Sequence, residues 1–459
     1  MSLKFAKVFE SFIQQRPVAV MARCVLERLL NAERIDQLFQ QTAEVQYTRD
    51  LLFSSVVDLM GQVVLGVQPS VHAAYQAQAE ELGVSDQAVY DKLNRIEPRI
   101  SAELVRDSAR QAAEVIDALD ARLPPFLKGY RTKILDGNHF SATEHRIQEL
   151  RTTWAAPLPG KALVVLDQET MLADHVIPCE DGHAQERSLL SQVLPCVGEG
   201  ELWIADRNLS TVGFMAGIIL RKSKFVFRQH GQLKGELIGS LKAKGKISTG
   251  KVYEQKMRIV DGDGTVHTLR RIKVELKEPT RDGDTELYIL TNLSVQDAGA
   301  KTVAQLYARR WTIETMFQEL TETLTCEVRT LGYPKAALFA FCLALLAYHA
   351  VSLLKAAMRA VHGRETVERK ISAYYLSLEI SQTYDGMMVA VPAPQWAVFR
   401  TLTPAEFAGF LKQWASNMTL RRYRKHPRGP KKPPPDKSAY ENGGHVSTAR
   451  ILKMRQLKQ

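Results

Sequence analysis

The chain has 459 residues and a mass of 51.6 kDa, which is too long for one ordinary domain and indicates several structural units. Apolar residues make up 45% and charged residues 24%, so the composition excludes a disordered chain, a collagen-like fibre and a small disulfide-rich scaffold. The net charge is +11, and +10 of it falls on residues 421–459, which hold twelve Lys and Arg residues against two acidic ones. A nearly neutral body with a strongly basic tail indicates a polyanionic partner.

The cysteines and the N-terminus indicate a cellular compartment. No two of the five cysteines form a C-x-x-C pair, and their odd number favours neither a disulfide framework nor a structural zinc site. Such cysteines are typical of a reducing compartment. Residues 1–16 mix charges every few positions and lack the apolar core of a signal peptide. We therefore expect a cytoplasmic protein.

The first 125 residues are expected to be helical, because apolar residues recur at helical spacing in two long stretches. Within this region, residues 82–93 contain Gly83 at a turn and Ser85 as a typical N-cap residue before a short amphipathic helix. This pattern is typical of a helix-turn-helix, although a plain αα-hairpin has the same local signals. Pro124 and Pro125 then mark the end of the N-terminal unit.

From Lys133 onward, short apolar runs alternate with helical patterns. Two of these runs end in aspartate, at Asp136 and Asp206. The turn-like Asp167-Gln168-Glu169-Thr170 separates two further runs, as in a β-hairpin, and Asp174 in the second of them is expected to be solvated. The expected order β-β-β-α-β-α-β is made by residues 133–136, 162–166, 171–177, 184–197, 202–206, 212–220 and 224–228.

The next segment is expected to be β-rich from Gly250 to Leu293, where Asp-Gly pairs mark hairpin turns. A strongly periodic helix follows over Val303–Leu324. Residues 336–354 carry no formal charge, and their length alone would suit a membrane span. Because they include polar side chains and no second span accompanies them, we expect a buried core helix. The tail contains Pro430–Pro435 and is expected to be an extended basic linker.

Three acidic side chains in this order suit metal-dependent chemistry on a phosphodiester. Asp136 and Asp206 end central strands, and Glu314 projects from the periodic helix. Carboxylates are hard oxygen ligands for Mg²⁺, and two cations about 4 Å apart can activate an attacking oxygen and stabilise the leaving oxygen. Arg207 and Arg310 would supply positive charge to DNA phosphates near the metals.

At these points the sequence resembles the DDE transposases of the insertion-sequence four family. The first two acidic motifs are Leu135-Asp136-Gly137-Asn138-His139 and Ile204-Ala205-Asp206-Arg207-Asn208. The third motif matches the family signature Tyr-x2-Arg-x3-Glu-x6-Lys at Tyr307, Arg310 and Glu314, whereas the position of the signature lysine is Thr321. The resemblance extends over most of the chain, and the β-rich stretch corresponds to the family's insertion domain.

The resemblance implies a ribonuclease H-like α/β fold, in which a β-rich insertion interrupts a mixed-sheet catalytic core. A helical N-terminal DNA-binding domain and a helical C-terminal region would flank that core. The implied divisions are 1–125 for the N-terminal domain, 126–230 and 299–360 for the two parts of the core, 231–298 for the insertion, 361–420 for the C-terminal region and 421–459 for the basic tail.

The resemblance also implies a function. Asp136, Asp206 and Glu314 would carry catalysis and bind the metal, with Mg²⁺ as the cofactor and Mn²⁺ as a substitute. The DNA contacts would come from His139, Arg207, Tyr307, Arg310 and Trp311. The enzyme would bind the terminal inverted repeats of a bacterial insertion sequence as a homodimer, cut the strand ends and join them to target DNA, with no membrane partner. In this family a hairpin intermediate on the element end is a further option.

Several alternatives stay open at this point. A catalytically impaired or domesticated DNA-binding repressor is opposed by the intact acidic set and favoured by Thr321. A nuclease without strand transfer would carry the same motifs. Within the site, Asp167 could replace Asp136 as the first ligand, although it lies in a turn. Taken alone, Arg310 and Glu314 could form an ordinary i,i+4 surface ion pair.

Overall fold

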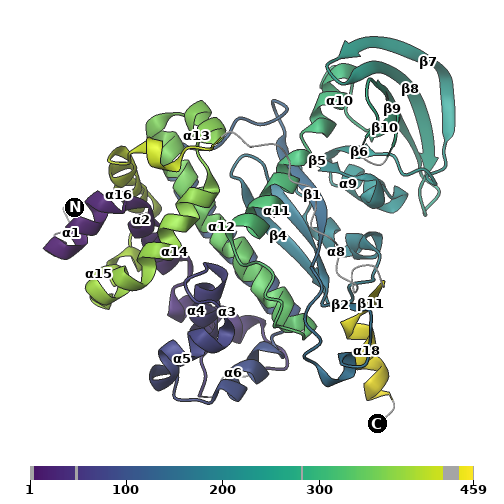
Figure 1. Cartoon of the computed structure of the whole chain (residues 1–459). Coiled ribbons are helices and arrows are strands. Elements are labelled where there is room, and N and C mark those ends of the chain that lie inside the picture. Colours follow the sequence, from purple (N-terminus) through teal and green to yellow (C-terminus); the bar gives the residue numbers. More distant parts are fainter. Residues whose placement is uncertain (1–4, 47–49, 281–282, 427–443, 458–459) are drawn as a thin grey trace.

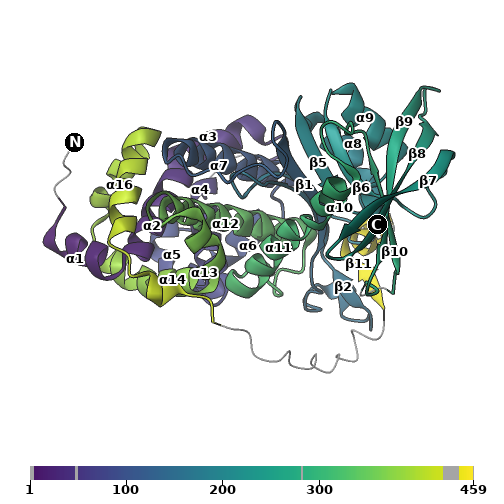
Figure 2. The same ribbon diagram turned by 90° about the horizontal axis from the view of Figure 1, so that it is seen from above.

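The computed structural model describes residues 5–46, 50–280, 283–426 and 444–457. Nine of its described strands form one long mixed sheet on one side of the molecule, and most of its helices gather in a body on the other side (Figures 1 and 2). The nine strands of the sheet run in the order β4-β3-β1-β5-β6-β10-β9-β8-β7. The chain thus passes from helices to sheet and returns to helices.

Five neighbouring strands, from the edge strand β4 to β6, make the first half of the sheet. β1 pairs antiparallel with β3 and parallel with β5, while β3 pairs antiparallel with β4 and β5 parallel with β6. This order, with β3 as the one strand of reversed direction, is a ribonuclease H-like topology and confirms the predicted fold class. The five strands are β1 (Arg131–His139), β3 (Lys161–Asp167), β4 (Leu172–Cys179), β5 (Glu201–Ala205) and β6 (Lys224–Arg228).

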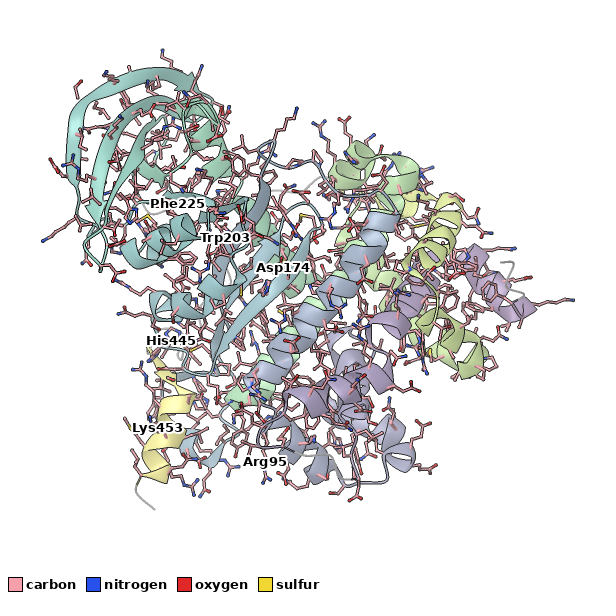
Figure 3. All side chains as sticks on the ribbon, turned by 180° about the vertical axis from the view of Figure 1, so that it is seen from behind. Arg95, Asp174, Trp203, Phe225, His445 and Lys453 are labelled. Atoms are coloured by element: carbon pink, nitrogen blue, oxygen red, sulfur yellow. The ribbon has the colours of Figure 1, made fainter. Side chains whose placement is uncertain are left out.

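The central strands are buried on both faces, as in other sheets that helices cover on each side. On one face, Trp203 and Phe225 belong to a cluster that includes residues of α8 (Leu190–Val193) and α9 (Val212–Leu220) (Figure 3). Ile134 packs into a different cluster, that of the helical body. Since successive strand residues point to opposite faces, Asp136 lies on the same side as Ile134.

The expected helix over residues 184–197 is irregular. The structure divides it into η2 (Glu186–Leu189), α8 and η3 (Leu194–Cys196), of which the first and last are 3₁₀ turns. Pro195 stands in the last turn, where its missing N–H removes a donor from a regular helix. The segment still covers the sheet, because Leu189, Leu190 and Val193 are buried.

The predicted β-rich stretch continues the catalytic sheet. β10 pairs antiparallel with β6, so the insertion shares the hydrogen-bonded ladder of the core and curves away from it (Figure 1). The predicted turn at Asp261–Gly264 joins β8 to β9. The insertion begins earlier than the expected stretch, with β7. Its strands are β7 (Glu236–Ile247), β8 (Gly250–Val260), β9 (Val266–Leu276) and β10 (Glu286–Thr291).

The N-terminal part is helical, as predicted. α5 ends at Gly83, whose φ of +64° lies in the left-handed region that favours glycine. The Ser85 hydroxyl then accepts a hydrogen bond from the Ala88 N–H at 3.3 Å and begins α6. The helices are α1 (Lys7–Gln15), α2 (Pro17–Leu29), α3 (Ala32–Thr42), α4 (Phe53–Val64), α5 (Val71–Leu82), α6 (Asp86–Leu93) and α7 (Pro98–Ala118).

The charge-free segment forms the central helix of the helical body. α12 (Pro334–His362) contacts α2, α4, α7, α16 and β4, and its most apolar window is wholly buried in the protein. This burial confirms the prediction of a core helix. One hydrophobic cluster joins α12 with helices from both ends of the chain (Figure 2). The C-terminal helices are α13 (Arg364–Lys370), α14 (Ala373–Ala390), α15 (Ala393–Ala397) and α16 (Pro404–Ser416).

The basic tail is folded at both of its described ends. Near its start, the buried Tyr423 donates a hydrogen bond from its hydroxyl to Glu379 Oε2 at 2.6 Å. At its end, β11 (His445–Ser447) pairs parallel with β2 (Ala156–Leu158), and α18 (Thr448–Gln456) follows (Figure 3). The proline-rich segment expected to be the linker lies outside the described residues.

Candidate active site

The first two acidic residues lie side by side at the end of a parallel strand pair. The pairing of β1 and β5 ends with Leu135 opposite Ala205, so the next residues along the two strands are Asp136 and Asp206. The Asp136 side chain is 17% exposed, and its Oδ1 accepts a hydrogen bond from the Gly137 N–H at 2.9 Å. Both carboxylates therefore have a position set by the register of the sheet.

The helix expected over Val303–Leu324 is two helices, α10 (Ala300–Ala308) and α11 (Trp311–Thr323). At the break, the Arg309 and Arg310 N–H groups bond to carbonyls three residues back, each at 3.0 Å, instead of four residues back. Such 3₁₀-type bonding tightens the turn and changes the direction in which the following side chains point. As a result, the end of α10 and the start of α11 both face the two aspartates.

Two side chains from this break hold the carboxylates. The Tyr307 hydroxyl donates to Asp206 Oδ1 at 2.9 Å. The Arg310 guanidinium donates from Nη1 to Asp136 Oδ2 at 2.6 Å and from Nη2 to Glu314 Oε1. One cation thus bridges the first and third acidic residues. The Arg310 side chain is 13% exposed, so this is not the ordinary surface ion pair that the helix alone would allow.

The electrostatics of the site reflect its burial. Burial raises the pKa of Asp136 from its usual 3.8 to about 6, although Arg310 acts in the opposite direction, and Asp206 and Glu186 add to the rise. Burial followed by the Asp206 charge raises the pKa of Tyr307 well above its usual value, so its hydroxyl stays a hydrogen-bond donor. Burial favours the neutral form of Arg310, but Asp136, Tyr307, Asp206 and Glu314 together outweigh it and the Arg310 pKa is raised.

The other predicted DNA-contacting residues surround this centre. His139 ends β1 with its side chain 55% exposed, and Lys161 Nζ lies 3.2 Å from His139 Nε2. The indole of Trp311 is exposed beside the first turn of α11. Arg207 Nη1 lies 3.8 Å from Asp284 Oδ2, in the connection between β9 and β10. The structure therefore places all three on the periphery, with different neighbours.

Asp167, the rival first ligand, already has partners. Lys133 Nζ donates to Asp167 Oδ2 at 2.9 Å, and Arg131 donates to the same oxygen. Burial opposes ionisation here, but Lys133 keeps the pKa of Asp167 below its usual value. The expectation of a solvated Asp174 is wrong, because its carboxylate also pairs with Lys133 and its pKa is lowered to about 2. These aspartates belong to a buried ion cluster, and Asp167 is not a candidate ligand.

The donor set fits a hard divalent cation by its chemistry, since all three acidic side chains offer carboxylate oxygens. Within the described ranges, however, no three His, Cys, Asp or Glu side chains are grouped as metal ligands. Arg310 stands between Asp136 and Glu314, and the Tyr307 hydroxyl contacts Asp206. Binding of a cation by the whole set would require Arg310 to leave at least one carboxylate.

The structure adds residues that sequence reasoning missed. The Glu186 carboxylate lies against the Gly137 backbone, next to Asp136. Arg228, at the end of β6, pairs with Asp284 at 2.6 Å and contributes to the potential at Tyr307 and Asp206. Glu186 lies fifty residues from Asp136 in the sequence, so only the glycine directly after the aspartate could have suggested that another group packs there.

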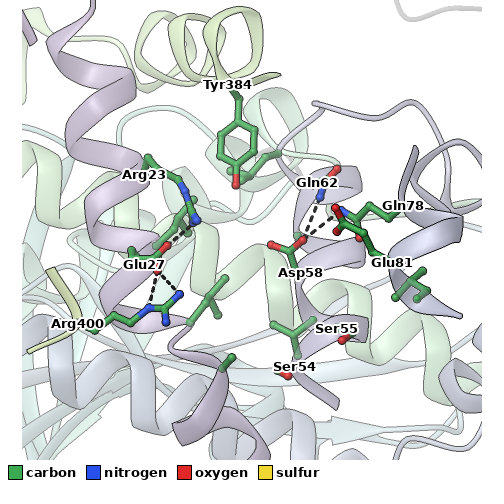
Figure 4. Close-up of a pocket in the computed structure, with 17 residues that line it drawn as sticks. Arg23, Glu27, Ser54, Ser55, Asp58, Gln62, Gln78, Glu81, Tyr384 and Arg400 are labelled. Carbon is green, nitrogen blue, oxygen red and sulfur yellow. Dashed lines mark hydrogen bonds and ion pairs between the residues drawn. The ribbon is translucent and has the colours of Figure 1, made fainter. Parts of the chain in front are cut away.

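A separate polar pocket of about 320 Å³ lies among α2, α4, α5 and α14 in the helical body (Figure 4). Glu27 stands between Arg23 and Arg400 there, and Asp58 accepts hydrogen bonds from glutamine side chains. Glu27 is thus paired with both arginines within the pocket wall. None of the three acidic residues of the candidate site lines it.

Comparisons with known proteins agree with this geometry. Residues 127–349 match the family model described as Transposase DDE domain, and this range contains Asp136, Asp206 and Glu314. A search of curated proteins returned no match. Among solved structures, the chain is similar to the piggyBac transposase in a cryo-EM synaptic complex with hairpin DNA, with 10% identity, a TM-score of 0.40 and 84% of each chain covered. Residues 127–349 therefore form a transposase DDE domain, and the enzyme activity that this domain supports is that of a DDE-type DNA transposase.

Proposed function

We propose that this chain is the transposase of a bacterial insertion sequence and belongs to the insertion-sequence four family. The observation that carries the proposal is the contact of Asp136, Asp206 and Glu314 with the signature residues Tyr307 and Arg310 inside a transposase DDE domain. A chance pairing of a surface arginine with a glutamate would not also reach a carboxylate 174 residues away.

The three acidic residues would be the metal ligands, with Mg²⁺ as the cofactor and Mn²⁺ as its substitute. When bound, such cations activate an attacking oxygen and stabilise a leaving oxygen of a phosphodiester. Tyr307 would keep Asp206 in position through its hydroxyl. Arg310 would donate two hydrogen bonds to a DNA phosphate once DNA enters, since a guanidinium suits bidentate phosphate binding.

The reaction would have two steps at one site. In the first, the oxygen of water attacks phosphorus at the element end, and the bond from phosphorus to the 3′ oxygen breaks. In the second, the freed 3′-OH attacks a phosphodiester of target DNA and displaces its 3′ oxygen. Both steps are in-line displacements, so no covalent enzyme intermediate is required. A hairpin on the element end would be an additional transesterification of the same kind.

The remaining parts of the chain would bind and arrange DNA. The helix-turn-helix of α5 and α6 would read the terminal inverted repeats, and His139, Arg207 and Trp311 would contact DNA near the cut. Two copies of the chain would hold two element ends in one complex. The basic residues of the tail would add contacts to phosphates. The enzyme would work on the nucleoid, in the cytoplasm.

A supercoiled plasmid that carries paired element ends tests the proposal. Asp136→Ala, Asp206→Ala and Glu314→Ala should each abolish cutting and joining in Mg²⁺ and leave binding of end DNA largely intact. Glu322→Ala, which changes an exposed residue of the same helix, is the matched control and should act like the wild type. A near-normal cutting rate in any of the three variants would remove that residue from the metal site.

The same plasmid separates the alternatives. A transposase cuts the ends and joins them to target DNA, a nuclease cuts only, and a decayed repressor binds without cutting. The repressor is the alternative that an observation supports, because Thr321 stands where the family signature has lysine.

A further inference from the structure

Glu186 occupies a place that only a glycine on β1 allows. It begins η2, in the connection between β4 and β5. A Cβ atom added at Gly137 would lie 2.2 Å from Glu186 Oε1 and 2.7 Å from its Cδ, far inside van der Waals contact. Gly137 directly follows Asp136, so the backbone of the first acidic motif forms a cradle for a second carboxylate.

Among the described residues, the printed cationic partner of the Glu186 carboxylate is a distant imidazole. Its side chain is only 13% exposed. The nearest cationic candidate is His139, whose Nδ1 lies 3.8 Å from Glu186 Oε1. Lys161 turns its ammonium group to His139 Nε2 and to the Ala184 carbonyl instead. A shielded carboxylate whose partner is only a distant imidazole is costly, and such groups commonly serve a ligand.

The charge around the site is also one-sided. Asp136, Asp206, Glu314 and Glu186 bring four carboxylates, and Arg310 is the cation that bridges two of them. Glu186 and Asp206 both contribute negative potential at Asp136. Arg228, at the end of β6, is paired with Asp284. One guanidinium leaves most of this negative charge uncompensated, which favours divalent cations.

We propose that Glu186 is a fourth carboxylate of the metal site and strengthens its hold on divalent cations. This inference rests on the proposed function, since it adds a residue to the site formed by Asp136, Asp206 and Glu314. Gly137 is the positioning residue, because its missing side chain lets the Glu186 carboxylate pack against the β1 backbone directly after Asp136. Glu186 would thus be a metal-binding residue in addition to the three acidic residues of the DDE motif.

The test measures Mn²⁺ binding to the full chain by the electron paramagnetic resonance signal of free Mn²⁺. Glu186→Gln keeps the size of the side chain and removes its charge. It should weaken Mn²⁺ binding about 10-fold, which is a typical effect of removing a group that supports metal ligands. Glu199→Gln is the matched control, since Glu199 is exposed, close in sequence and paired with Lys222 at 3.2 Å. It should bind Mn²⁺ like the wild type.

A second variant displaces the same carboxylate without changing Glu186 itself. Gly137→Ala would push the Glu186 carboxylate away without changing any charge, and should also weaken Mn²⁺ binding about 10-fold. Melting temperatures in EDTA identify any variant that fails to fold. If both folded variants bind Mn²⁺ like the Glu199→Gln control, the inference is overturned. Asp206→Asn distinguishes this outcome from a failure of the proposed function. If only the role of Glu186 is wrong, Asp206→Asn should still weaken Mn²⁺ binding. If the proposed metal site is wrong, Asp206→Asn should bind Mn²⁺ like the wild type as well.

Discussion

Replacing Asp136 by asparagine should stabilise the metal-free protein at neutral pH. The pKa of Asp136 is raised from 3.8 to about 6, because its carboxylate is buried and one guanidinium does not compensate for the lost water. A tenfold change in proton affinity corresponds to about 1.4 kcal/mol, so keeping Asp136 ionised in the folded state costs about 3 kcal/mol at pH 7. Asparagine has nearly the same shape and carries no such cost.

The gain should depend on pH in one direction. Between the unfolded pKa of 3.8 and the folded pKa of about 6, the folded state binds more protons than the unfolded state. The stability contributed by Asp136 therefore falls as pH rises through this window and stays low above it. The advantage of Asp136→Asn should be largest above pH 6, about half as large at pH 5 and mostly lost at pH 4.

Thermal unfolding in EDTA across this pH range measures the effect. At pH 7.5, Asp136→Asn should melt about 3 °C above the wild type. Asp167→Asn is the control of opposite sign: Lys133 and Arg131 keep the Asp167 pKa low, so asparagine there should lower the melting temperature. An Asp136→Asn variant that melts below the wild type at pH 7.5 would refute the reasoning, because the Arg310 bridge would then outweigh the cost of burial.

Three further predictions concern DNA. Tyr307→Phe removes the hydrogen bond to Asp206 and should slow single-turnover cleavage about 10-fold with unchanged DNA affinity, as expected for a bond to a charged group; an unchanged rate would mean that the hydroxyl does not position the carboxylate. Deletion of residues 427–459 should flatten the log–log salt dependence of DNA binding by about 0.9 per lost phosphate contact, whereas an equal slope would assign the tail a solubilising role. Thr321→Lys, an exposed position seven residues after Glu314, should steepen that slope by about 0.9 and raise the cleavage rate. Equal slopes for Thr321→Lys and wild type would mean that another cation, such as Arg329, already fills the position.

The centre of the fold could be predicted because it depends on short-range patterns. Apolar runs that end at Asp136 and Asp206 predict parallel strands, and strands of this kind end at one edge of a sheet. The Gly83 and Ser85 signals predict the turn between α5 and α6, and the structure confirms it. The uncharged stretch within α12 also predicts a buried helix, because a segment of this apolar composition is stable only when it is shielded from water.

The parts that escaped prediction depend on contacts between distant residues. Lys133 lies within an apolar run, and nothing local indicates that it pairs with both Asp167 and Asp174 across three strands. The break between α10 and α11 leaves the helical periodicity intact, so the sequence pattern favours one continuous helix. β11 has three residues, too few for a strand pattern, and it is recognisable only by its pairing with β2.

The metal-free site explains why an aspartate is retained at position 136 although its burial lowers the stability of the fold. A residue that destabilises the fold by burial persists when its function requires it, and Asp136 is such a residue by the sign of its pKa shift. Arg310 reduces this cost by bridging Asp136 and Glu314, yet a single positive charge cannot balance both carboxylates. In the proposed function, a DNA phosphate offers Arg310 a better bidentate partner. DNA entry would then free the two carboxylates for cations, so the same arginine links binding of the substrate to assembly of the metal site.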